Sequence, residues 1–283
     1  MRPALEAYAS YLEGSDRAAL GRFIVPLSRL DELEAAATGL MPREPHAEPW
    51  RLSVLVTGDA RAAAEKLSRF NGRHTAARAA NGHAVVDVVE MKATVADEIA
   101  AQRRDLPKSF TRYFEIPLTG DVPGLVMAIG KAGARAKVRT GGTTPDAFPP
   151  AKAVVDFIIA CQRQGVPFKA TAGLHHPIRG EYRLTYEPGS PKGTMYGFLN
   201  IFVAAMLLHA GAGEDTAIAA LEENNASAFI FEDDALIWRG KRISADEIAA
   251  SRSELAISFG SCSFREPVDE LEQLTGITRA INQ

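Results

Sequence analysis

Basic side chains alternate with apolar ones in two short segments near the middle of the chain. The segment RAKVR carries Lys137 and Arg139, and the segment PFKAT carries Lys169 and Thr171. Because successive side chains of a strand point to opposite faces, Lys137 shares a face with Arg139, and Lys169 with Thr171. A lysine held near other cations and apolar walls has a lowered pKa and can form a Schiff base with a carbonyl compound. The two segments therefore make imine chemistry available.

Carboxylates, hydroxyls and glycines follow other strand-like segments. Glu90 ends one segment and shares a face with Lys92, and Glu115 lies in the next segment. The residues that we expect to bind a substrate anion are Lys92, Arg139, Gly141, Gly142, Thr171, His175, Gly260, Ser261 and Ser263. Glycines let backbone N–H groups approach a phosphate or carboxylate, and hydroxyls add further donors.

Eight strand-like runs alternate with helix-like segments along the chain. The runs are Arg22–Leu27, Leu52–Thr57, Ala84–Met91, Thr111–Pro117, Arg135–Arg139, Pro167–Thr171, Ala228–Glu232 and Ala256–Gly260. Such alternation is typical of parallel sheets with crossover helices. Eight units match the closure number of the (β/α)8 barrel, which we prefer to an open doubly wound sheet. Since no Pro-, Gly- or Ser-rich linker divides the chain, we expect residues 1–283 to form one TIM-barrel domain.

Three further features complete the expected architecture. Pro3–Glu13 is an extra amphipathic helix, a candidate plug at the amino end of the barrel. Ala235–Ile243 resembles a small hairpin after the seventh strand. His175-His176-Pro177 opens a long loop, Ile178–Thr194, which is a candidate lid because loops of this length are usually functional or disordered. In barrels of this class the active site lies on the carboxyl-end loops, where the charged residues fall.

The segment Phe168-Lys169-Ala170-Thr171-Ala172-Gly173-Leu174 resembles the sixth strand of the deoxyribose-phosphate aldolase family, whose Lys-x-Ser/Thr-x-Gly pattern carries the imine-forming lysine of a class I aldolase. The resemblance implies that Lys169 is the nucleophile. The family's second lysine, on strand seven, has no counterpart in Phe229–Asp234, so Lys137 would have to lower the pKa of Lys169. Its proton-transferring aspartate also lacks a match, so Glu90 or Glu115 would have to serve.

The resulting expectation is a Schiff-base carbon–carbon lyase that acts on a small anionic carbonyl compound without a cofactor. One alternative is a metal-dependent lyase or isomerase, with Glu90, Glu115, His175 and Asp233 as ligands. Lys92, Lys137, Arg139 and Lys169 would repel a cation, so no metal is expected. The other alternative is a catalytically silent barrel that binds a small anion.

Cys262 is the remaining residue with nucleophilic chemistry that stands at a strand end. No partner base is evident near it in the sequence, so we expect a packing or backbone role. If the strand stays extended as far as His175, alternation places this side chain on the same face as Lys169 and Thr171. The alternative role for His175 is that of a hydrogen-bonded loop anchor.

Composition limits the binding partners and the cellular compartment that we expect. Hydrophobic residues make up 46% of 283 and the formal net charge is −3, which gives no reason to expect nucleic acid or a membrane as partner. The two cysteines are far apart and the first residues lack an apolar signal region, so we expect a cytoplasmic protein. The sequence is compatible with a homo-oligomer as well as with a monomer.

Overall fold

The structure is a computed structural model and describes residues 1–75 and 81–275. The chain divides into two compact units, residues 1–115 and residues 116–283, and each is described by itself below. The assignment of residues 1–283 to one domain therefore stays a prediction.

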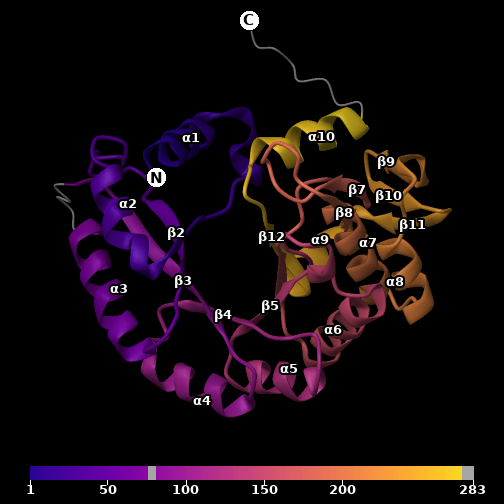
Figure 1. The fold of residues 1–283 in the computed structure, drawn as a ribbon, viewed down its shortest axis with the longest axis horizontal. Helices are drawn as coiled ribbons and strands as arrows, with labels where there is room; N and C mark the ends of the chain where they lie inside the picture. Colours follow the sequence, from indigo (N-terminus) through magenta and orange to yellow (C-terminus); the bar gives the residue numbers. More distant parts are fainter. Residues whose placement is uncertain (76–80, 276–283) are drawn as a thin grey trace, which may run out of the picture. The chain divides into compact units, whose positions relative to one another are not determined.

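The first unit alternates helices with four strands. Its elements are α1 (Arg2–Glu13), β1 (Phe23–Pro26), α2 (Leu30–Ala36), β2 (Trp50–Leu55), α3 (Ala60–His74), β3 (Ala84–Lys92), α4 (Ala96–Asp105) and β4 (Thr111–Glu115). The strands pair in parallel in the order β1-β2-β3-β4. Figure 1 shows α3 alongside β3, which it contacts. The side chain of Asp59 begins α3 by accepting hydrogen bonds from the backbone N–H groups of Arg61 and Ala62.

Helix α1 packs at the amino ends of β1 and β2, as the sequence predicted for the extra helix. The Tyr8 ring meets Phe23 and Trp50, the first residues of these two strands, edge to face with centroids 5.4 Å apart in both pairs. Its hydroxyl group lies 3.3 Å from the backbone carbonyl oxygens of Gly21 and Arg51. The aromatic ring thus fills the apolar end of the sheet while its hydroxyl group remains hydrogen-bonded.

The second unit contains three further parallel strands and a separate antiparallel part. Its elements are α5 (Val122–Lys131), β5 (Arg135–Arg139), α6 (Ala151–Gln164), β6 (Phe168–Thr171), β7 (Gly180–Arg183), β8 (Lys192–Met195), α7 (Phe198–His209), α8 (Glu214–Leu221), β9 (Phe229–Glu232), β10 (Ala235–Trp238), β11 (Lys241–Ser244), α9 (Ala245–Glu254), β12 (Ala256–Gly260) and α10 (Arg265–Thr275). Strand β6 pairs in parallel with β5 on one side and with β12 on the other. Seven of the eight predicted strands are therefore found in parallel pairings, with helices between them.

The predicted seventh strand is not one of these parallel strands. Phe229–Glu232 forms β9 and pairs antiparallel with β10, and β10 pairs with β11. Only two residues separate β9 from β10, so a short turn closes this pair at low entropic cost, whereas a parallel pairing needs a long crossover. A parallel barrel strand is buried on both faces, but only Phe229 of β9 is buried. The closed eight-stranded barrel is thus not confirmed.

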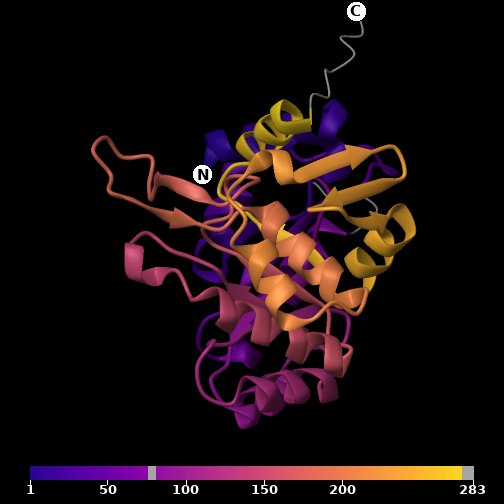
Figure 2. The same ribbon diagram turned by 90° about the vertical axis from the view of Figure 1, so that its right-hand side faces the viewer.

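The antiparallel sheet belongs to the periphery of its unit. Figure 2 shows β9, β10 and β11 (orange) next to α9, which contacts β10 and β11. The segment predicted as a long loop after β6 also contains structure, because β7 and β8 form a two-stranded antiparallel ribbon within it. Helix α7 is almost wholly apolar, and ten of its twelve residues are buried. Among the described residues, no helix combines the length and apolar character that a membrane crossing requires.

Candidate functional site

The two lysines at the centre of the sequence-based hypothesis lie side by side in the second unit. Lys137 of β5 stands directly opposite Lys169 of β6, and Lys169 stands opposite Ser258 of β12. Both lysines are buried, with 7% and 6% of their surface exposed. Each also takes part in polar interactions, so neither amine is unpartnered. The alternation of β5 and β6 therefore brings the two amines to one face of the sheet.

The other face of these strands packs against helix α6. The Phe168 ring meets the Phe157 ring of α6 edge to face, with centroids 5.3 Å apart, and both residues are buried. Ala170 follows Phe168 with the same parity and is also buried. Because α6 holds this apolar face, Lys169 and Thr171 point to the face away from α6.

The carboxyl ends of β5 and β6 are tied together by Thr140. Its backbone N–H donates to the carbonyl oxygen of Thr171 at 2.9 Å, and its hydroxyl group donates to that of Ala172 at 2.9 Å. Arg139 stands opposite Thr171 and is exposed. Arg139 and Thr171 thus lie on the same face as the two lysines, at its carboxyl end.

Gly141 and Gly142, which we expected to cradle an anion, are required for packing. A Cβ atom on Gly141 would lie 2.4 Å from the Phe148 ring, and one on Gly142 would lie 2.6 Å from the Ala147 side chain. A Cβ atom on Gly173 would also meet Phe148, at 2.8 Å. The Phe148 ring therefore covers the turns that follow β5 and β6. Anion binding by Gly141 and Gly142 stays a prediction.

The loops that follow β6 and β12 meet beyond these strand ends. Gly260 of β12 stands opposite Thr171 of β6, so the loop that holds His175 and the loop that holds Cys262 leave the sheet side by side. His175 Nδ1 lies 3.1 Å from Glu266 Oε2 at the start of α10. The Tyr186 hydroxyl group, from the turn between β7 and β8, donates to the same carboxylate oxygen at 2.6 Å and lies 3.1 Å from His175 Nδ1.

The loop of Cys262 thus lies beside the loop of His175, and the Cys262 thiol interacts with the His175 imidazole. This contact raises the pKa of His175 above its ordinary value in spite of partial burial, and Glu266 adds to the increase. The same contact lowers the pKa of Cys262 below its ordinary value, against desolvation and the nearby Glu266. The sequence did not indicate this pairing. Exposure of the thiol is at odds with the packing role expected for Cys262, and the backbone role stays a prediction.

The two serines of the predicted anion cradle organise the start of α10. The backbone N–H of Glu266 donates to the Ser263 hydroxyl oxygen at 3.2 Å, and the N–H of Ser263 donates to that of Ser261 at 3.4 Å. Both hydroxyl groups are thus used within the loop after Gly260, and Ser263 orients the first turn of α10. Their contribution to anion binding stays a prediction.

His176, the second histidine of the pair, has partners of its own. Its ring stacks on Tyr182, with centroids 3.5 Å apart, and its Nδ1 lies 2.9 Å from each carboxylate oxygen of Glu270. Within the described residues, His176, Glu266 and Glu270 form one group whose ligand atoms all lie within 4.8 Å of one another and could by distance hold a metal ion. Glu266 Oε2 also contacts His175 and Tyr186, so Glu266 is shared between this group and His175.

The predicted acidic residues lie in the first unit. Glu90 is buried and accepts a hydrogen bond of 2.5 Å from the Ser53 hydroxyl group. Lys92 stands opposite Glu115 on the neighbouring strand, and their charged groups lie 3.7 Å apart. Alternation therefore places Glu90, Lys92 and Glu115 on one face of this unit's sheet. The remaining predicted metal ligand, Asp233, is exposed in the turn between β9 and β10 of the second unit.

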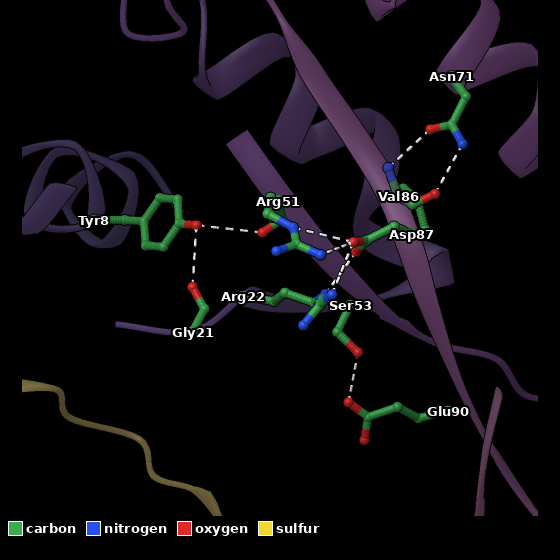
Figure 3. A network of polar contacts seen from close by, with 9 residues as sticks. All are labelled: Tyr8, Gly21, Arg22, Arg51, Ser53, Asn71, Val86, Asp87 and Glu90. Carbon is green, nitrogen blue, oxygen red and sulfur yellow. Dashed lines mark hydrogen bonds and ion pairs between the residues drawn. The ribbon is translucent and has the colours of Figure 1, made fainter. Parts of the chain in front are cut away.

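A polar network in the first unit stabilises its sheet next to this face. Figure 3 shows the guanidinium groups of Arg22 and Arg51 both donating hydrogen bonds to the carboxylate of Asp87 of β3. In the same view Asn71 of α3 exchanges two hydrogen bonds of 2.8 Å with the backbone of Val86. These contacts fix α3 against β3 and so fix the strand that carries Glu90.

Comparison with known proteins gives no further assignment: no family model, curated protein or solved structure matches this chain. The resemblance to the aldolase family is confined to residues 168–174.

Proposed function

We propose that the second unit forms a Schiff base between Lys169 and a small anionic carbonyl compound, and that the protein acts as a carbon–carbon lyase. The observation that carries this proposal is the placement of Lys137 directly opposite Lys169, with both side chains buried. Two lysines buried on one face of the sheet offer an amine nucleophile that is withdrawn from bulk water, and an imine requires the neutral form of such an amine.

The reaction would use Lys169 as an electron sink. Its amine attacks the carbonyl carbon, water leaves, and the resulting iminium ion accepts the electron pair that is released when the adjacent carbon–carbon bond breaks. Arg139 and Thr171, at the carboxyl end of the same face, would bind the anionic group of the substrate. Glu90 and Glu115 lie in the first unit, and their expected part in proton transfer stays a prediction.

Borohydride trapping tests the imine directly. We expect pyruvate, glyoxylate or acetaldehyde with borohydride to add a stable mass to Lys169, and we expect Lys169→Met to abolish this adduct. Lys137→Met should reduce adduct formation at neutral pH by at least about tenfold, the effect of removing one neighbouring charge. Lys131→Met is the matched control, since Lys131 is an exposed lysine at the end of α5 and should leave trapping unchanged.

Absence of an adduct at Lys169 with all three compounds would refute the imine proposal and favour a module that binds a small anion. A stoichiometric metal in protein purified without chelator would favour the metal-dependent lyase or isomerase.

We also propose that the protein works in the reducing cytoplasm. Both of its cysteines, Cys161 and Cys262, are free thiols, and an exposed free thiol such as Cys262 persists best where thiols are kept reduced.

A further inference from the structure

We infer that Cys262, His175 and Glu266 form a second covalent site in the same unit, at which the Cys262 thiol attacks activated acyl compounds such as esters or thioesters. The inference goes beyond the lysine chemistry, because it uses none of the lysines. It rests on the carboxylate of Glu266 in contact with the His175 imidazole, and on the pairing of β6 with β12, which brings the Cys262 thiol to the loop of that histidine.

The fold brings these groups together from distant parts of the sequence. Glu266 and His175 are 91 positions apart, yet the pairing of Gly260 with Thr171 makes their loops neighbours. The side chain of Ser263 accepts from the backbone N–H of Glu266 and so fixes the residue that holds the histidine. The carboxylate also receives the Tyr186 hydroxyl group, which restricts it further.

The hydrogen bond to Glu266 orients the His175 ring through its Nδ1 atom. Nδ1 faces the Glu266 carboxylate at 3.1 Å, so the Nδ1–H tautomer donates to the carboxylate and leaves Nε2 unprotonated, the form in which it acts as a base. Contact with His175 lowers the pKa of Cys262 and raises that of His175, which favours a thiolate beside an imidazolium ion.

The other cysteine of the chain provides an internal contrast. Cys161 lies in α6, is fully buried, and burial raises the pKa of its thiol well above the ordinary value. Cys262 is exposed and has a base beside it. Exposure together with a basic partner is the environment of reactive cysteines, whereas buried cysteines are inert.

The proposed step is acyl transfer to sulfur. The Cys262 thiolate attacks the carbonyl carbon of the ester, a carbon–sulfur bond forms, and the bond from that carbon to the leaving oxygen breaks. The imidazolium ion of His175 gives its proton to the leaving group. Water then hydrolyses the acyl-thioester with His175 as base, which releases a carboxylic acid and restores the thiol.

Two probes test the site in the intact protein. Iodoacetamide reports nucleophilicity, because the thiolate displaces iodide and adds a carbamidomethyl group, and 4-nitrophenyl acetate reports acyl transfer through release of nitrophenolate. We expect iodoacetamide to modify Cys262 and to leave Cys161 unmodified in the folded protein. We expect the ester to give a burst of nitrophenolate with one acetyl group on Cys262, and Cys262→Ala to abolish both reactions.

Variants of the neighbours separate catalysis from simple exposure of the thiol. His175→Gln should slow alkylation of Cys262 at neutral pH at least about tenfold, and Glu266→Gln should slow it less, since general bases contribute about 100-fold or more and orienting groups act through them. His176→Gln is the matched control: this adjacent histidine bonds Glu270 instead and should leave the rate within about twofold of wild type. Lys169→Met should retain the acetyl adduct, which separates this site from the imine site.

Equal alkylation rates at Cys262 in the wild type and in His175→Gln would overturn the inference, and so would a burst whose acetyl group lies elsewhere. Protection of Cys262 by added Zn2+ that a chelator reverses would also overturn it, because the thiol would then be a metal ligand.

Discussion

Asp87 illustrates how single residues set the stability of the first unit. Burial opposes ionisation of its carboxyl group, but the hydrogen bonds from Arg22 and Arg51 outweigh that effect and lower the pKa of Asp87. Arg22 contacts both carboxylate oxygens, at 2.6 and 2.8 Å. Arg22 directly precedes β1 and Arg51 lies in β2. The carboxylate of Asp87 therefore connects β3 to both of these segments.

Replacing Asp87 by Asn should therefore destabilise the protein. We expect a loss of about 1–2 kcal/mol in the free energy of unfolding at neutral pH, typical of hydrogen bonds to charged groups that are partly open to solvent. Urea unfolding measures the loss. Asp31→Asn is the control, because the Asp31 side chain is 74% exposed and its ion pair with Lys66 should contribute at most about 1 kcal/mol.

The difference between wild type and Asp87→Asn should depend on pH in a defined direction. The folded-state pKa of Asp87 is lowered, so its contribution is fully present above the unfolded-state value of about 3.9 and is lost as pH falls through the folded-state value. The two proteins should thus converge in stability in acid. A constant difference from neutral pH down to strongly acidic pH would contradict this account.

Glycines show how local conformation and packing act on whole elements. Gly72 lies inside α3, is exposed, and a Cβ atom there would meet nothing within 4 Å. Gly141 follows β5, and a Cβ atom there would run into the Phe148 ring. The same substitution should therefore have opposite effects on the two elements.

We expect Gly72→Ala to stabilise the protein by about 0.5–1 kcal/mol, because alanine loses less conformational freedom in a helix. Gly141→Ala should destabilise it by about 1–3 kcal/mol, the usual cost of overpacking, since Phe148 must move. Chemical denaturation of both variants provides the comparison. Destabilisation by Gly72→Ala, or no effect of Gly141→Ala, would show that the packing described for these two positions is wrong.

At the scale of the whole molecule, the strands differ in whether they pair on both sides and in how many of their residues are buried. Strands β2 and β3 pair on both sides and most of their residues are buried. The ribbon of β7 and β8 has only two strands, and only Met195 in it is buried. Local opening requires little free energy where few buried contacts are lost.

Hydrogen exchange should reveal this difference. We expect the amides of β7 and β8 to exchange at least roughly a hundredfold faster than those of β2 and β3, because an isolated two-stranded hairpin is marginally stable. Exchange followed by peptide mass spectrometry measures it at the level of each strand. Equal protection of the ribbon and the central strands would mean that contacts outside the ribbon hold it in place.

The sequence by itself determined what depends on local pattern. Strands β5 and β12 begin and end at the predicted residues, and the extra amino-terminal helix lies at the amino ends of β1 and β2. Alternation along the two strands also predicted that Lys137 shares a face with Arg139 in β5, and that Lys169 shares a face with Thr171 in β6. These features follow from the side-chain period of two residues in a strand and 3.6 residues in a helix. Both periods can be read from a short segment without knowledge of the rest of the chain.

Only the tertiary structure decided which segments become neighbours. The apolar run Phe229–Glu232 has the composition of a strand, but its partner is the nearby β10 and not a distant parallel strand, because closing a short turn costs less entropy. Cys262 and His175 could not be paired from the sequence either, since nothing local connects two residues of loops so far apart. Their contact arises because β6 and β12 pair in parallel and release both loops at the same edge of the sheet.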